Sequence, residues 1–206
     1  MRILKVGTSI TILGLCVGCF AQRLERTHYM DHFNSGSAAF DQEDYVTAEK
    51  EFARAEWYAE TPDFGKSPAC IQAKAAALYN GALSVGHQGR FEEAERLLYQ
   101  TIALDSKTDS TNTALPAGRL FELARLHQAM GKNGLARKEY EQGIPIAEKF
   151  DLEKRDPIAL AIILEDYAKL LDLPADRRAE SFRERAKDIR ADHPGESSKT
   201  KIQYYP

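Results

Sequence analysis

The sequence has little cysteine, little tryptophan and no strong excess of charge of one sign. Its 206 residues include 3 Cys and 1 Trp, and 28 Lys and Arg stand against 31 Asp and Glu. Because nucleic-acid binding needs a basic surface for the phosphates, nucleic acid is not expected as a partner. Val, Ile and Thr are sparse after the first twenty residues, whereas Ala, Leu, Glu, Lys and Arg are common. This composition favours helix over strand and predicts an all-α fold with essentially no sheet.

Long apolar runs are missing except at the start of the chain. Arg2 and Lys5 give a short positive beginning, and the thirteen residues from Val6 to Gly18 carry no charge. A membrane-spanning helix needs roughly 20 apolar residues, so this run has the layout of a secretory signal rather than a permanent span. Without residues 1–18 the chain keeps 26 basic and 31 acidic residues, a net charge of −5.

The end of this run, Cys16-Val17-Gly18-Cys19, resembles a bacterial lipobox. In that motif a Leu-x-small-Cys pattern directs cleavage before the cysteine and attachment of diacylglycerol to its sulfur; here Cys16 replaces the leucine. The resemblance implies a signal peptide that ends at Gly18 and a membrane anchor on Cys19. A plain exported protein cleaved after Gly18 or Ala21 and an uncleaved membrane tether remain as alternatives.

The third cysteine, Cys70, would then be the only free thiol of the mature chain. No intrachain disulfide could form even in an oxidising compartment, so stability must come from helix packing. Because Cys70 lies in a segment rich in alanine, we expect it to be a small buried residue rather than a reactive group.

Four related segments follow residue 30, and each pairs a first helix containing small residues with a second helix that opens on a polar turn. Aligning the second helices on Ala48, Ala94, Ala136 and Ala179 gives spacings of 46, 42 and 43 residues. A regular period of this size is typical of a helical repeat array.

The second segment carries the clearest pattern, with Gly89 as a turn glycine, then Phe91, two acids, Ala94 and Leu98 four residues later. It resembles the tetratricopeptide (TPR) repeat, in its longer-period form typified by kinesin light chains. A small side chain lets two antiparallel helices approach closely, while the large neighbour fills the groove beside it. The resemblance covers roughly residues 30–190 and implies an α-α superhelix, a TPR-like solenoid of about four helical hairpins.

The fourth segment departs from this pattern. Tyr167 stands where a small residue is expected and Arg183 where a large apolar one is expected, so we interpret it as a degenerate, polar terminal repeat. The arginine-rich stretch 177–190 also contains acids at three- and four-residue spacing, which predicts a solvated, salt-bridged face.

Helix-capping residues and prolines divide the chain at the same places as the repeats. Ser67-Pro68 and Asp156-Pro157 are cap-plus-proline helix starts, and Pro116 and Pro174 open two more helices. Residues 105–113 form a polar linker, and the last residues have too few apolar side chains to pack. We therefore predict a signal peptide (1–18), a lipidated tether (19–30), a helical repeat domain (31–192) and a disordered tail (193–206).

Sequence motifs for catalysis are missing. Gly65-Lys66-Ser67 lacks the earlier glycine of a phosphate-binding loop, and no Gly-x-Ser-x-Gly elbow surrounds any serine. His28 and His32 could share a helical face, but no third strong metal ligand accompanies them. We expect no enzymatic activity, no cofactor, no metal site and no small-molecule substrate.

The TPR resemblance implies that the first helices line a concave groove that binds a protein or peptide. A carboxylate clamp of the kind some family members use is not expected, because Phe33, Gly118 and Glu122 stand where its cations would be. The groove should instead suit an apolar or extended segment. The alternative is that its aromatic residues are ordinary core. The projected groove residues are Phe33, Ser37, Phe40, Tyr79, Asn80, Leu83, Phe121, Arg125 and Gln128.

The sequence thus predicts a lipid-anchored scaffold for protein–protein interaction in the bacterial cell envelope. Phe20 follows Cys19 in place of the aspartate that marks inner-membrane retention in enteric bacteria, which favours the periplasmic face of the outer membrane. Two alternatives are a non-catalytic accessory subunit of a cell-wall or secretion enzyme complex and a self-associating structural lipoprotein.

Overall fold

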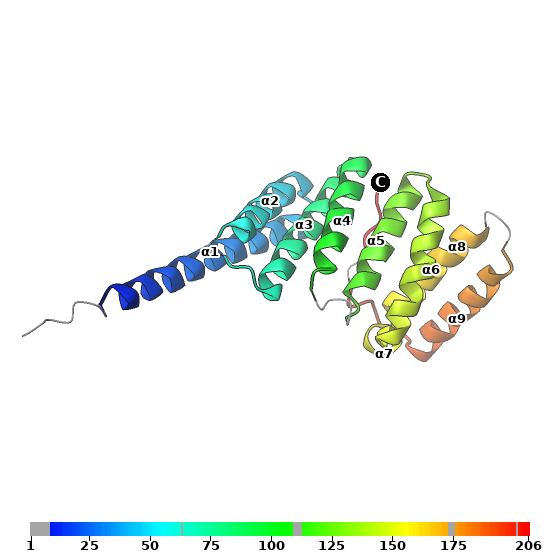
Figure 1. Ribbon diagram of the computed structural model, residues 1–206. Coiled ribbons are helices and arrows are strands. Elements are labelled where there is room, and N and C mark those ends of the chain that lie inside the picture. Colours follow the sequence, from blue (N-terminus) through cyan, green and yellow to red (C-terminus); the bar gives the residue numbers. More distant parts are fainter. Residues whose placement is uncertain (1–8, 63, 109–112, 173–175, 201) are drawn as a thin grey trace, which may run out of the picture. The chain divides into compact units, whose positions relative to one another are not determined.

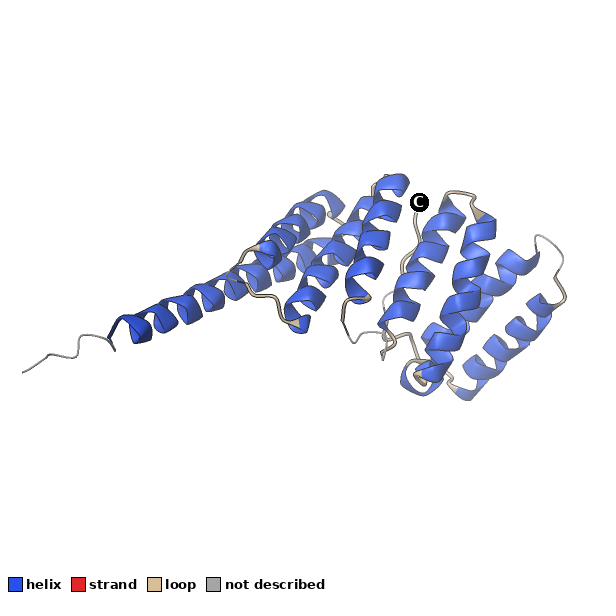
Figure 2. Ribbon diagram, viewed as in Figure 1, coloured by secondary structure: helices blue, strands red, loops and turns tan. Residues whose placement is uncertain are grey.

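The computed structural model describes residues 9–62, 64–108, 113–172, 176–200 and 202–206, with only the backbone described for residues 9–22. All regular secondary structure in these residues is helical (Figures 1 and 2), which confirms the predicted all-α fold. The helices are α1 (Ser9–Asp41), α2 (Tyr45–Glu60), α3 (Pro68–His87), α4 (Phe91–Asp105), α5 (Leu115–Ala129), α6 (Asn133–Lys149), α7 (Leu152–Arg155), α8 (Pro157–Asp172) and α9 (Arg178–Asp192).

The chain forms two compact units. Unit 1, Met1–Gln88, contains α1, α2 and α3, and unit 2, Gly89–Pro206, contains α4 to α9 with the residues that follow α9. Within unit 1, α2 packs against both α1 and α3; within unit 2, α5 pairs with α6 and α8 pairs with α9.

Side-chain caps set several of the helix starts. The Ser67 hydroxyl accepts a hydrogen bond from the Cys70 amide at 3.4 Å, and proline follows Ser67 at the first position of α3. Asp156 Oδ1 likewise accepts from the Ala159 amide at 3.1 Å at the start of α8. Each cap satisfies an amide that has no partner within the helix. The predicted starts at Pro68, Pro116 and Pro157 are thus confirmed, whereas Pro174 lies outside the described residues.

Glycines form two of the turns between helices. Gly89 has φ +76° between α3 and α4, and Gly131 has φ +70° between α5 and α6. This left-handed region is accessible to glycine at little cost, which explains the turn glycine of the repeat pattern.

The core of unit 1 is built on a glycine in α1. A Cβ placed on Gly36 would lie 2.9 Å from two ring atoms of Phe52, so only glycine allows α1 and α2 to pack this closely. Phe52 is buried, and Ala48, one turn earlier in α2, is fully buried. The predicted pairing of a small with a large residue is confirmed at this position.

The core of unit 2 is aromatic and aliphatic. Phe121 of α5 stacks on Tyr140 of α6, with ring centroids 6.0 Å apart, and Tyr140 contacts Tyr167 of α8 at 5.5 Å. Tyr167 in turn packs against Phe182 of α9 at 5.0 Å. In the degenerate fourth segment, Tyr167 at the small position therefore packs against Phe182, whereas Arg183 at the large position pairs with Asp172 and Glu180 near the surface.

The segment predicted as a tether, residues 19–30, is helical and belongs to α1. Tyr29 is buried, and its hydroxyl donates a hydrogen bond to the Ala73 carbonyl of α3 at 2.8 Å. The polar residues before it, such as Gln22, Arg23 and Glu25, are good helix formers, so the helix continues through them. Of the predicted polar linker 105–113, residues 109–112 lie outside the described part of the chain. No helix in the described part is long and apolar enough to cross a membrane.

Candidate functional site

A charged cluster joins two first helices of unit 2. Arg125 of α5 is 6% exposed and donates to Glu122 Oε1, one turn earlier, at 2.8 Å. The Arg125 Nε lies 3.6 Å from Asp166 Oδ2 of α8. We call the polar surface of these two helices, which includes Arg125, Gln128, Asp166, Lys169 and Asp156 at the start of α8, the α5/α8 face.

Burial acts in opposite directions on the partners of this cluster. It raises the pKa of Glu122 above its ordinary value, even though Arg125 and the Tyr205 hydroxyl favour the charged carboxylate. Burial alone would lower the pKa of Arg125, but Glu122 and Asp166 outweigh it, and the net shift is upward. The guanidinium is therefore held in its charged form between two carboxylates.

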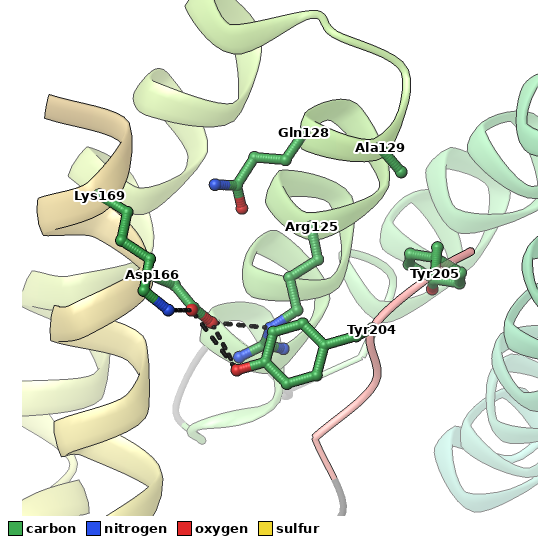
Figure 3. A pocket seen from close by; sticks show the side chains of 7 residues that line it. All are labelled: Arg125, Gln128, Ala129, Asp166, Lys169, Tyr204 and Tyr205. Carbon is green, nitrogen blue, oxygen red and sulfur yellow. Dashed lines mark hydrogen bonds and ion pairs between the residues drawn. The ribbon is translucent and has the colours of Figure 1, made fainter. Parts of the chain in front are cut away.

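The last residues of the chain lie across the α5/α8 face (Figure 3). The Tyr204 hydroxyl donates to Asp166, 3.2 Å from Oδ2 and 3.4 Å from Oδ1, and the Arg125 guanidinium carbon lies 6.0 Å from the Tyr204 ring centroid. Burial and the Asp166 charge raise the pKa of Tyr204 to about 12. A cavity of about 260 Å³ lies here, and its lining residues are Arg125, Gln128, Ala129, Asp166, Lys169, Tyr204 and Tyr205.

A second contact holds the same segment at the start of α8. Asp156 Oδ2 accepts hydrogen bonds from the Thr200 amide at 2.8 Å and from the Ser198 hydroxyl at 3.2 Å. The Lys199 ammonium donates to the Arg155 carbonyl at 2.8 Å. Burial would raise the pKa of Asp156, but the hydrogen bonds from Thr200 and Ala159 lower it below its ordinary value. Asp156 thus caps α8 with one oxygen and holds the segment with the other.

These contacts differ from the predicted disordered tail. Residues 193–200 and 202–206 are described, and Gln203 is 6% exposed. The prediction counted apolar residues, of which there are few, whereas the segment is held by hydrogen bonds to two aspartates about 40 residues earlier in the chain.

The groove residues predicted in unit 1 are partly buried. Phe40 and Leu83 are buried; the Phe40 ring contacts the rings of Tyr45 and His87. Phe33, Ser37, Tyr79 and Asn80 are half-buried. Phe33 stacks on Tyr29 and meets Phe52 edge to face; Ser37 donates to its own helix at the Phe33 carbonyl, as Asn80 does at Ala76.

The groove residues predicted in unit 2 divide between core and surface. Phe121 is 4% exposed and packs against Tyr140 and Gly143, in agreement with the core alternative. Arg125 is buried in the cluster described above rather than open in a groove. Gln128 is half-buried and lines the cavity of the α5/α8 face, where its Oε1 accepts from the Tyr140 hydroxyl at 3.1 Å.

A buried histidine joins three helices of unit 2. His127 of α5 has no exposed surface; its Nδ1 lies 2.8 Å from Glu139 Oε2 of α6 and its Nε2 lies 3.0 Å from Glu95 Oε1 of α4. Burial alone would lower the pKa of His127, but the two carboxylates raise it above its ordinary value of 6.5. Its position near the end of a first helix gave no sign of these partners.

The remaining candidates from the sequence have structural partners. His32 Nδ1 lies 2.7 Å from Glu51 Oε2, and the rings of His28 and His32 both stack on Tyr58. Within the described residues, no group of three His, Cys, Asp or Glu side chains could hold a metal ion. Cys70 is buried, as predicted. Cys19 lies in the part of α1 whose side chains are not described.

The arginines of α9 form the predicted salt-bridged face. Most of their acidic partners lie outside α9, so these pairs connect helices rather than support one. The pairs are Arg178 with Asp176 and Glu141, Arg183 with Asp172 and Glu180, Arg185 with Glu148 and Glu153, and Arg190 with Glu165.

No family model and no curated protein matches the chain. Several solved structures are similar to it. One is the structure of nearly identical TPR-like repeats from a Podosopora anserina protein described as a kinesin light chain, in a form with one substituted residue. It matches with a TM-score of 0.61 at 19% identity, over 80% of this chain and 76% of that one. Another structure of these repeats gives 0.59 at 19% identity, over 82% and 77%.

A third similar structure is BtubC (BKLC) from P. vanneervenii, with a TM-score of 0.56 at 17% identity over 97% of this chain and 98% of that one. Identities this low show the fold alone. These matches and the helical pairing described above show that the chain folds as a TPR-like repeat protein.

Proposed function

We propose that the protein is a scaffold for protein–protein interaction, held at a membrane of the bacterial cell envelope by lipid on Cys19. The observation that carries the binding part is the α5/α8 face, which already holds an extended polypeptide segment through Asp156 and Asp166. TPR-like repeats generally bind protein partners, which supports the same interpretation.

Lipid attachment is supported by the positive start, the short apolar run and the Gly18-Cys19 pair. Cys19→Ala should abolish incorporation of labelled palmitate and leave a precursor with its signal sequence attached, because the sulfur that takes the lipid is gone. Cys16→Ala and Cys70→Ala are matched controls that should label and mature normally. Normal labelling of Cys19→Ala would refute the anchor. Density-gradient separation of the membranes then tests the outer-membrane assignment.

Partner binding is tested by photo-crosslinking in intact cells. A photoreactive amino acid would replace Asn80 or Lys169 on first helices, with Glu92 and Lys138 on second helices as controls. Adducts to another protein from the first-helix positions alone would support the scaffold. Adducts to a second copy of the chain from the second-helix positions would favour the self-associating alternative, and an enzyme subunit as the adduct would identify the accessory role. No adduct from Asn80 or Lys169 would contradict the proposal.

A further inference from the structure

We propose that the α5/α8 face is a binding surface for extended, tyrosine-containing segments, and that residues 196–206 of the chain occupy it in exchange with such a partner. This inference rests on the proposed scaffold function and gives it a partner chemistry. It starts from the contacts of the last residues with Asp156, Asp166 and Arg125.

Charged side chains lie beneath the segment. Glu122, Arg125 and Asp166 are paired with one another, so each charge keeps a partner when the segment leaves. A segment that belongs to the core covers apolar side chains, and its removal exposes them to water at high cost. Water can instead solvate a paired, charged surface, so the segment can leave without exposing a core.

The segment is held unevenly, since Gln203 is buried and the neighbouring Tyr204 is exposed. Its described residues, 196–200 and 202–206, form no helix, and Tyr204 is 58% exposed although its hydroxyl is bound. Its contacts include hydrogen bonds from hydroxyl, ammonium and amide groups, together with the edge contact of Tyr205 with Phe91 of α4 at 6.4 Å. This is the pattern of an extended peptide on a protein surface.

The acceptors on the face define which segments fit. Asp156 and Asp166 both accept hydrogen bonds, so a partner must present donors to both, with a hydroxyl or amide at the first aspartate and a phenol at the second. In the chain's own segment these donors are four residues apart, at Thr200 and Tyr204. Arg125, beside the phenol ring, adds a cation–π contact. The expected partner is therefore an extended, uncharged or basic segment with a tyrosine four residues after the first donor.

Phosphate on that tyrosine would prevent binding. A phosphotyrosine carries close to two negative charges and loses the donor hydroxyl, and it would lie against the Asp166 carboxylate. The face thus differs from a phosphotyrosine-binding site, which surrounds its ligand with cations.

The test is a titration with a fluorescent synthetic peptide of residues 196–206, measured by anisotropy on the full-length chain in detergent. In the unmodified chain the tethered segment competes at an effective concentration of about millimolar. Tyr204→Ala weakens the tethered segment but leaves the face intact, so the peptide should bind this variant about 10-fold more tightly. Within that variant, Asp166→Asn should reduce affinity about 10-fold, and Asp172→Asn, a control on the same helix, should not.

Any of four outcomes would overturn the proposal. The first is equal peptide affinity for the unmodified chain and Tyr204→Ala, and the second is equal binding of the phosphotyrosine peptide. The third is a large loss of thermal stability in Tyr204→Ala, which would make the segment part of the core. A dimer formed by exchange of the segment, seen by sedimentation, would also overturn the occupancy within one chain. If a partner protein is crosslinked at Lys169 but the peptide does not exchange, the proposed scaffold function is retained and only the exchange of residues 196–206 is rejected.

Discussion

Gly143 of α6 offers a sharp test of the packing in unit 2. A Cβ on Gly143 would lie 2.6 Å from Phe121 Cε1 and 3.1 Å from two other ring atoms. Phe121 is 4% exposed and stacked on Tyr140, so the ring has little space in which to move. Gly143→Ala should therefore destabilise the protein, although alanine is the better helix former.

The magnitude follows from two opposing effects. Replacing glycine by alanine inside a helix gains about 1 kcal/mol, whereas overpacking a core costs about 1–3 kcal/mol. The net loss should be about 0–2 kcal/mol for Gly143→Ala. Gly118→Ala in α5 is the matched control, because a Cβ there meets no atom within 4 Å. It should gain about 0.5–1 kcal/mol, which leaves a gap of about 0.5–3 kcal/mol between the two variants.

Urea and thermal denaturation measure this gap, since 1 kcal/mol shifts the Tm of a protein of this size by about 2–4 °C. In a Phe121→Leu background the ring edge is gone, and Gly143→Ala should then behave more like Gly118→Ala. The difference between the backgrounds is the coupling energy of the pair. The packing argument fails if Gly143→Ala and Gly118→Ala raise the Tm equally.

Three further perturbations test other contacts. His127→Asn should destabilise the protein most at low pH. Glu95 and Glu139 outweigh burial and raise the pKa of His127 above 6.5. The contribution of the charged ring to the free energy of unfolding is therefore complete below pH 6.5 and disappears as the pH rises through the folded-state pKa. A pH-independent loss in urea denaturation would contradict this. Arg125→Ala should cost about 3–5 kcal/mol by leaving buried carboxylates unpaired, and a loss below about 1 kcal/mol in the same assay would show that the cluster is hydrated. Gly36→Ala should lower the Tm, because its Cβ would lie 2.9 Å from a ring of α2; an increase would reject that contact.

The fold could be predicted because its signals are local. The repeat alanines mark the second helices, which begin at Tyr45, Phe91 and Asn133 within a few residues of the aligned polar turns. Glycine turns and cap-plus-proline pairs act through neighbouring residues, so their spacing in the sequence already describes the structure. The one-turn helix α7 was missed, because four residues are too few for a periodic pattern.

The candidate site depended on residues far apart in the chain. Whether Phe121 faces a groove or the core is decided by Gly143, which lies in another helix and outside the repeat motif. The position of the last residues is decided by Asp156 and Asp166, whose role as hydrogen-bond acceptors leaves no periodic trace. Burial of Arg125 could not be inferred either, because its partner on α8 is 41 residues away.

The continuity of α1 has a mechanical consequence for an anchored protein. Cys19 and the buried Tyr29 lie ten residues apart in one uninterrupted helix, a span of about 15 Å at the rise of an α-helix. Lipid on Cys19 would then be joined to unit 1 by a stiff helix rather than by a flexible linker. A stiff helix transmits tilt as well as position, so the bilayer would restrict the orientation of unit 1. A glycine-rich insertion between the two residues would release that restriction without removing the anchor.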